Sequence, residues 1–206
     1  RFNFKKYFSN ISIKGWNNDY KIVHLSDLHI GSFNSVEKVE EIVNIVNDQN
    51  PDLIVFTGDL VNNYHSEVLP YVNVLKKLKA KDGKYSVLGN HDYCDYVGWK
   101  RSSVEWRENF ENMKKIQSKI GFDLLLNDSR VINSSNNSFN IVGVENWGAG
   151  NNISLALSDK NSVYNYITLG SNYGSVRVKY IYGTLENIKL NINRFITARG
   201  IEWTNK

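Results

Sequence analysis

The chain has 206 residues, of which 41% are hydrophobic and 22% are charged. This length supports one sizeable domain, and the composition excludes a disordered tail. The single cysteine, Cys94, excludes an intrachain disulfide framework and a cysteine-rich zinc module. The longest apolar runs have the length of strands, so the sequence predicts no transmembrane helix.

The hydrophobic pattern predicts an α/β domain. Strand-sized apolar runs occupy five segments: 21–27, 53–59, 85–88, 123–126 and 139–144. Apolar residues at helical spacing mark three further segments: 35–50, 69–78 and 106–120. Because strands and helices alternate along most of this stretch, we expect a largely parallel central sheet.

The last quarter of the chain differs from the rest. Residues 1–150 contain 18 basic and 18 acidic side chains, whereas residues 151–206 contain 7 basic and 3 acidic ones, so the net charge of +4 lies entirely in this region. Alternation over 176–182 and 188–195 predicts a β-hairpin. We therefore predict a basic, β-rich tail over residues 149–206.

A short polar cluster follows each of the first three predicted strands. Loops at the carboxyl ends of strands form the ligand crevice of an open α/β sheet, so these clusters should converge in space although about thirty residues separate them. Each cluster alone is common in turns, but the three in this order indicate a site. They contain Asp27 and His29, then Asp59, and finally Asn90, His91 and Asp92.

These residue types indicate a metal site. Carboxylate and amide oxygens combined with imidazole nitrogen suit Mn, Fe or Zn better than Ca or Mg. Two such ions, roughly 3.5–4 Å apart, can clamp a phosphoryl group and generate hydroxide from a bridging water, and Asp59 could bridge them. His91 could then donate a proton to the leaving oxygen, with Asp92 fixing its tautomer.

Four segments resemble the calcineurin-like metallophosphoesterases, and among them a bacterial, membrane-associated branch. The segments are S-D-L-H (26–29), F-T-G-D-L-V-N (56–62), L-G-N-H-D-Y (88–93) and I-V-G-V-E-N-W-G (141–148). The resemblance covers about residues 21–148, after a lead-in over 1–20. It implies a β-sandwich flanked by helices and hydrolysis of a phosphomonoester or phosphodiester.

The resemblance also implies a binuclear metal centre. Asp27, His29 and Asp59 would hold the first metal, and Asp59 and Asn90 the second. His91 would be the catalytic histidine. The family also has later histidines, including a Gly-His-x-His motif, that complete both sites, whereas this chain has no histidine after His91. We therefore expect an incomplete or replaced second half and a second metal site that lacks ligands.

The missing histidines leave a second hypothesis open, a non-catalytic remnant or binding module with the phosphoesterase fold. A third, nucleic-acid binding through the basic tail, ranks last, and we expect a phosphoester substrate and no nucleic-acid partner. Arg1 suggests a missing upstream region, through which the parent protein would contact a membrane. Compartment and oligomeric state are not indicated.

The remaining candidate residues favour structural roles. We expect His24 to be a core or inter-sheet histidine and Cys94 to be structural. His65 follows Asp59 and is expected to be a solvated loop residue rather than a metal neighbour. Three tryptophans are expected in the core or a pocket wall: Trp99, Trp106 and Trp147.

Overall fold

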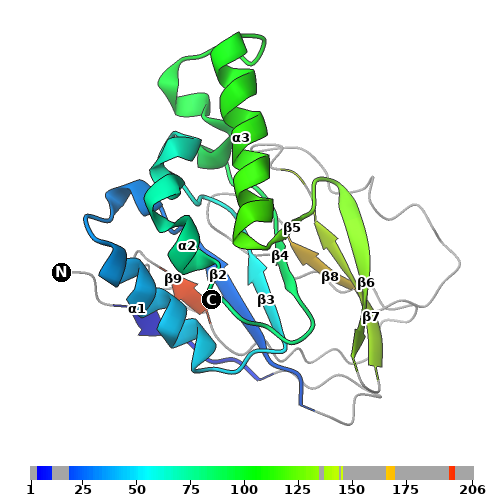
Figure 1. Ribbon diagram of the computed structural model, residues 1–206. Helices are drawn as coiled ribbons and strands as arrows, with labels where there is room; N and C mark the ends of the chain where they lie inside the picture. Colours follow the sequence, from blue (N-terminus) through cyan, green and yellow to red (C-terminus); the bar gives the residue numbers. More distant parts are fainter. Residues whose placement is uncertain are drawn as a thin grey trace, which may run out of the picture.

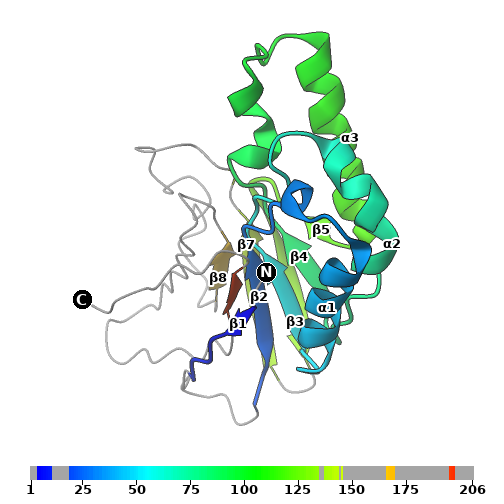
Figure 2. The same ribbon diagram turned by 90° about the vertical axis from the view of Figure 1, so that its left-hand side faces the viewer.

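The computed structural model describes residues 4–10, 19–134, 137–143, 145, 166–169 and 195–197. Its centre is a sandwich of two β-sheets, and the helices cover the outer face of the larger sheet (Figures 1 and 2). This arrangement confirms the α/β sandwich predicted from the sequence. The larger sheet matters most for function, because the predicted site residues follow its strands.

The larger sheet has six strands in the order β1-β9-β2-β3-β4-β5. Adjacent strands in this sheet are parallel, except for the edge strand β1, which pairs antiparallel with β9. The chain order β2, β3, β4, β5 is also the spatial order, as expected for right-handed crossovers through helices. The strands are β1 (Lys5–Lys6), β2 (Ile22–Ser26), β3 (Leu53–Phe56), β4 (Lys84–Ser86), β5 (Asp123–Leu124) and β9 (Phe195–Thr197).

Helices α1 (Val36–Asn47) and α3 (Val104–Ile120) form where the apolar spacing predicts them. Each buries one apolar stripe against the larger sheet, for example Val39 and Val43 of α1. The hydroxyl of Ser103 accepts a hydrogen bond from Trp106 N, and α3 ends at Gly121, which has a φ of +92°. A serine N-cap and a left-handed glycine at the end are the usual boundaries of a helix.

The helix predicted over 69–78 is much shorter. A 3₁₀-helix, η2, spans His65–Tyr71, and α2 spans only Val72–Leu75. Pro70 lies inside η2. Because proline has no backbone N–H and clashes with the preceding turn, it prevents a regular α-helix through this position.

The smaller sheet has the order β6-β7-β8. Strands β6 (Asp128–Ser134) and β7 (Asn137–Gly143) form an antiparallel hairpin, and β8 (Tyr166–Leu169) pairs in parallel with β7. Strand β6 was not predicted. The residues packed between the two sheets are Ile22, Leu53, Val55, Val87, Leu125, Ile132, Phe139 and Ile141.

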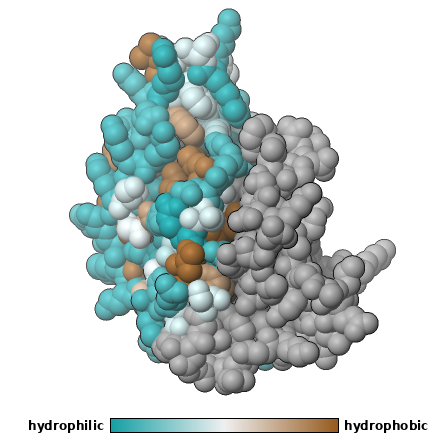
Figure 3. Space-filling view, turned by 90° about the vertical axis from the view of Figure 1, so that its right-hand side faces the viewer, coloured by the Kyte–Doolittle hydropathy of each residue, from teal (hydrophilic) through white to brown (hydrophobic). Residues whose placement is uncertain are grey.

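Strands β8 and β9 come from the region predicted as a separate tail, and they extend the smaller and the larger sheet respectively. The hairpin predicted over 176–182 and 188–195 lies outside the described residues, apart from Phe195 at the start of β9. Within the described part of the chain, none of the helices has the length and apolar character needed to span a bilayer. On the face in Figure 3, hydrophilic residues cover most of the described surface, with small apolar patches among them.

Candidate metal centre

The loops after β2 and β3 turn sharply and stay hydrogen-bonded to each other beyond the strands. Asp27 and His29 have φ values of +53° and +43°, and Asp59 has a φ of +57°. Their backbones are joined by bonds from Asp27 N to Gly58 O and from His29 N to Asp59 O, both 3.0 Å long. Non-glycine residues rarely adopt positive φ, and such strain concentrates at functional sites.

Two glycines allow the loops after β3 and β4 to approach closely. A Cβ on Gly58 would lie 2.0 Å from the backbone nitrogen of Gly89, and a Cβ on Gly89 would lie 2.1 Å from Oδ1 of Asp59. Real Cβ atoms do not make such contacts. Both positions therefore require glycine, which explains why Asp59 and Asn90 each follow one directly.

The buried carboxylate of Asp92 connects these two loops. Its side chain accepts hydrogen bonds from backbone amides on both loops, with lengths between 2.8 and 3.3 Å, and the residue has 0% exposure. Burial, together with the negative charge of Asp59, raises the pKa of Asp92 to about 7, although the amide hydrogen bonds act to lower it. The donors are the backbone nitrogens of Asp59, Leu60, Val61 and Gly89.

The predicted role of Asp92 as the residue that fixes the tautomer of His91 is wrong. Both Asp92 oxygens are occupied by backbone amides, and Nδ1 of His91 lies 2.6 Å from the carbonyl oxygen of Asn62. A carbonyl can only accept, so Nδ1 carries the proton and donates it to Asn62. Nε2 of His91 is then the ring nitrogen available for a proton or a metal.

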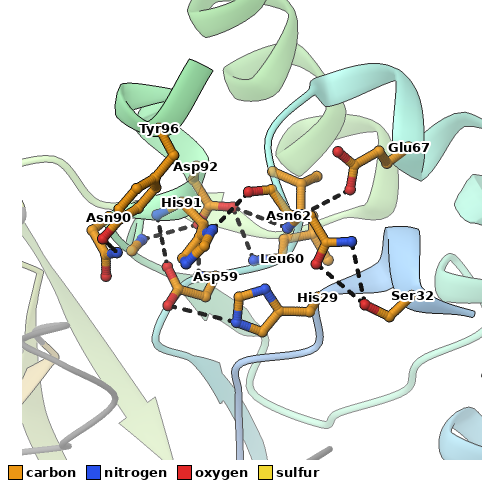
Figure 4. Close-up of polar contacts among 12 residues, drawn as sticks. His29, Ser32, Asp59, Leu60, Asn62, Glu67, Asn90, His91, Asp92 and Tyr96 are labelled. Atoms are coloured by element: carbon orange, nitrogen blue, oxygen red, sulfur yellow. Dashed lines mark hydrogen bonds and ion pairs between the residues drawn. The ribbon is translucent and has the colours of Figure 1, made fainter. Parts of the chain in front are cut away.

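Within the described residues, one group of metal-ligating side chains comes together, and it consists of His29, Asp59 and His91. One potential ligand atom from each lies within 4.8 Å of the other two. Nε2 of His29 is 4.0 Å from Oδ2 of Asp59, and the two imidazole rings meet edge to face with centroids 4.6 Å apart (Figure 4). Three convergent donors from three separate loops fit a divalent transition metal, which takes mixed oxygen and nitrogen ligands.

The other two predicted ligands lie beside this group. Asp27 is half-buried and outside the group of three. Burial raises the pKa of Asp59, and the negative charge of Asp27 raises it further, while the hydrogen bond from His91 N lowers it. Asn90 begins the 3₁₀-helix η3 (His91–Tyr93), and its Nδ2 donates to the hydroxyl of Tyr96 at 2.7 Å.

Sequence reasoning missed the residues that hold His91 in place. Asn62 supplies the carbonyl that accepts from Nδ1, and the Glu67 carboxylate accepts from the amides of Asn62, Asn63 and Tyr64 at 2.7–2.9 Å. Glu67 lies three residues after Tyr64, which is the spacing of a capping box, but a tyrosine in the first position does not give the sequence signature of that motif. The sequence carries no pattern for the Asn62 carbonyl either.

The histidines outside the group have structural partners. Nε2 of His24 lies 2.8 Å from the Thr57 hydroxyl across β2 and β3, which confirms the predicted core role, and burial lowers the pKa of His24 to about 3. His65 lies outside the metal group, as expected, but it is not the solvated loop residue predicted: it begins η2, is half-buried, and bonds through its backbone nitrogen and its ring to Asn109.

Cys94 and Trp106 also have the structural roles predicted for them. Cys94 is buried, and burial raises the pKa of its thiol to about 11. Trp106 donates from its indole nitrogen to the Tyr93 carbonyl and stacks on Phe110. Trp99 is half-buried against Tyr64, and Trp147 lies outside the described residues.

A family model matches most of this chain. The chain matches the family model described as calcineurin-like phosphoesterase over residues 20–204. It therefore belongs to the calcineurin-like phosphoesterase family, whose members are phosphoester hydrolases that typically bind divalent metals. The match extends beyond the 21–148 segment on which the sequence resemblance rests.

Curated relatives support the same assignment. The chain is 34% identical over 128 residues to the uncharacterized metallophosphoesterase YkoQ of Bacillus subtilis, covering 61% of this chain and 43% of that protein. It is 39% identical over 82 residues to YkuE of the same organism, covering 37% of this chain and 28% of that protein.

A vertebrate relative is also similar. The transmembrane protein with metallophosphoesterase domain of Danio rerio is 38% identical over 84 residues, covering 40% of this chain and 19% of that protein. The matched part of this chain covers less than half the length of each of these three relatives.

Proposed function

We propose that this chain is a divalent-metal-dependent hydrolase of phosphomonoesters or phosphodiesters. The observation that carries the proposal is the convergence of His29, Asp59 and His91, whose ligand atoms lie within 4.8 Å of one another. They follow parallel strands of one sheet, where α/β proteins place their ligand sites. Family membership supports the phosphoester class of substrate.

In this proposal Asp27, His29, Asp59 and Asn90 are metal ligands. Oδ1 of Asp59 accepts a hydrogen bond from His91 N at 3.0 Å, and Oδ2 is the oxygen nearer to His29. The two oxygens therefore face different neighbours, a geometry suited to bridging two cations. When bound, Mn, Fe or Zn would polarise the phosphoryl oxygens and activate the attacking water.

His91 is the proposed proton donor to the leaving oxygen. Its Nδ1–H is held by the Asn62 carbonyl, so the ring plane is fixed and Nε2 is the nitrogen that exchanges a proton. Asp92 contributes indirectly in this proposal, because its carboxylate accepts from the amides of Asp59 and of Gly89, the residue before Asn90, and its oxygens do not bond to the His91 ring.

The direct test is hydrolysis of bis(p-nitrophenyl) phosphate and p-nitrophenyl phosphate with Mn²⁺, Fe²⁺ or Zn²⁺ added to the metal-stripped protein. We expect metal-dependent release of nitrophenolate that falls by about 100-fold or more in Asp59→Asn. Asp48→Asn is the matched control, since Asp48 is an exposed residue at the end of α1. A folded protein with no metal-dependent hydrolysis of either ester would contradict the proposal.

A second candidate is a phosphoester-binding module without turnover. The chain has four histidines, all at or before His91, and two of them are bonded to Thr57 and Asn109 instead of the metal group. This leaves two imidazoles for the site. If the chain is such a module, Mn²⁺ should bind to it and slow the dissociation of a phosphate ester from the protein, with no hydrolysis in the assay above.

A further inference from the structure

We propose that Tyr96 is a positioning residue for the metal centre, where it orients both Asn90 and His91. The proposal deepens the phosphoesterase function proposed above and rests on it for its effect on catalysis. Its structural content is separate, because it concerns contacts that Tyr96 makes in the metal-free protein. Figure 4 shows the Tyr96 ring beside the ring of His91, with its hydroxyl near the Asn90 amide.

The first contact orients the Asn90 amide. A carboxamide has an oxygen that can bind a metal and an NH₂ group that cannot, and the two ends have nearly the same shape. Nδ2 of Asn90 donates to the hydroxyl of Tyr96 at 2.7 Å. This bond holds the NH₂ end on the Tyr96 side and leaves Oδ1 as the end that remains for a cation.

The second contact orients the His91 ring. The ring of Tyr96 stacks on it with centroids 4.5 Å apart and an interplanar angle of 28°. His29 meets another part of the same ring edge-on, and the Asn62 carbonyl holds its Nδ1. Three neighbours therefore restrict the imidazole, and Tyr96 is the exposed one among them, with 62% of its surface accessible.

Tyr96 is held in this place by its own short segment. It lies in the middle of the 3₁₀-helix η4 (Asp95–Val97), which begins directly after Cys94 in the left-handed region. Asp95 is tied to Arg101 by an ion pair, and the Arg101 guanidinium lies over the ring of Tyr93. The backbone carrying Tyr96 is thus anchored on both sides.

The exposure of Tyr96 makes the proposal testable, because its removal should cost little folding free energy. Tyr96→Phe removes the acceptor of the Asn90 bond and keeps the ring stack, whereas Tyr96→Leu removes both. Tyr7→Phe is the control, since Tyr7 is also an exposed tyrosine and lies near the start of the chain. Two readouts are needed: NMR spectra of the metal-free proteins and Mn²⁺ affinity by calorimetry.

We expect Tyr96→Phe to shift the side-chain amide resonances of Asn90 and to leave the His91 ring resonances in place. Mn²⁺ affinity should fall by about tenfold, as for other outer partners of metal ligands. Tyr96→Leu should also shift the His91 ring protons, because it removes the neighbouring aromatic ring. In an active enzyme, Tyr96→Leu should lower kcat more than Tyr96→Phe does.

The proposal is overturned if both variants keep the Asn90 and His91 resonances of the wild type, or if Mn²⁺ affinity is the same in all variants of a protein that binds Mn²⁺. Failure of the proposed phosphoesterase function gives a different result. In that case the wild type itself hydrolyses no phosphoester, while the resonances of Asn90 and His91 in the variants still decide the role of Tyr96.

Discussion

The carboxylate of Asp92 accepts a hydrogen bond from the backbone amide of Asp59 at 2.8 Å. Through this bond a buried side chain on the loop after β4 fixes the position of a candidate metal ligand on the loop after β3. The same carboxylate holds the amides of Leu60 and Gly89. The geometry of the site therefore depends on a residue that does not belong to the ligand group.

Replacing Asp92 with asparagine should destabilise the protein. One acceptor oxygen becomes an NH₂ group that faces backbone N–H donors, so at least one buried amide loses its partner. We expect the free energy of unfolding to fall by about 2–4 kcal/mol, measured by urea denaturation. Asp48→Asn should change it by no more than about 0.5 kcal/mol. Equal stability of the two variants would show that Asp92 does not hold the loops.

Gly89→Ala should disrupt the site through a direct clash. The added Cβ would lie 2.1 Å from Oδ1 of Asp59 and 2.4 Å from its backbone nitrogen. We expect the free energy of unfolding to fall by about 1–3 kcal/mol and the affinity for Mn²⁺ to fall markedly. Gly89 does not have a positive φ, so the clash alone should act there. Gly98→Ala is the contrasting variant, because its φ of +76° gives backbone strain while its Cβ position lies in open space. Normal Mn²⁺ binding by Gly89→Ala would refute the steric argument.

Glu67→Ala should loosen the segment that holds His91. Its carboxylate accepts from the amides of Asn62, Asn63 and Tyr64, and the Asn62 carbonyl accepts from the His91 ring. Hydrogen exchange at these three amides should speed up by at least about tenfold, given that each bond to a charged group contributes about 1.5–3 kcal/mol. Unchanged protection of these amides would mean that Glu67 is not their anchor.

Acid should destabilise the fold through His24. Burial lowers the pKa of His24 to about 3, whereas an unfolded histidine titrates near 6.5. Between these values the unfolded chain binds the extra proton, so stability falls as the pH drops below about 6.5, by up to about 1.4 kcal/mol per unit. Above that pH, His24 makes no contribution to the pH dependence of stability.

The measurement for this prediction is urea denaturation of wild type and His24→Gln between pH 4 and 8. Glutamine retains a polar partner for the Thr57 hydroxyl, which lies 2.8 Å from His24 Nε2. The stability difference between the two proteins should change with pH only below about 6.5. A difference that is constant over the whole range would contradict the buried, neutral state of His24.

Much of this architecture could be predicted, because local patterns determine it. The apolar strands and the polar residues directly after them were visible, and the rule that parallel strands end at one edge brought His29 and Asp59 together. Strand β6 escaped prediction because just one of its side chains, Ile132, is fully buried. The break between η2 and α2 could have been anticipated from Pro70, whereas the end of α2 at Leu75 has no such signal.

The partners of His91 and Asp92 could not be predicted for a physical reason. Both are held through backbone groups, the Asn62 carbonyl for His91 and amides for Asp92, and every residue has such groups. Adjacent residues in Asn-His-Asp suggested a contact between the two side chains. The tight turn of η3 instead directs the Asp92 side chain into the protein and the His91 side chain to the ligand group.

The most direct test of this account is a Mn²⁺ titration of the metal-stripped protein, followed by the loss of the free-ion EPR signal. We predict that the folded wild type takes up at least one Mn²⁺ per chain and that Asp59→Asn takes up none at the same concentrations, while Asp48→Asn binds as the wild type does. A folded wild-type protein that leaves all Mn²⁺ free, with Zn²⁺ and Fe²⁺ also unbound by competition, would contradict the proposed metal centre at Asp27, His29, Asp59 and Asn90.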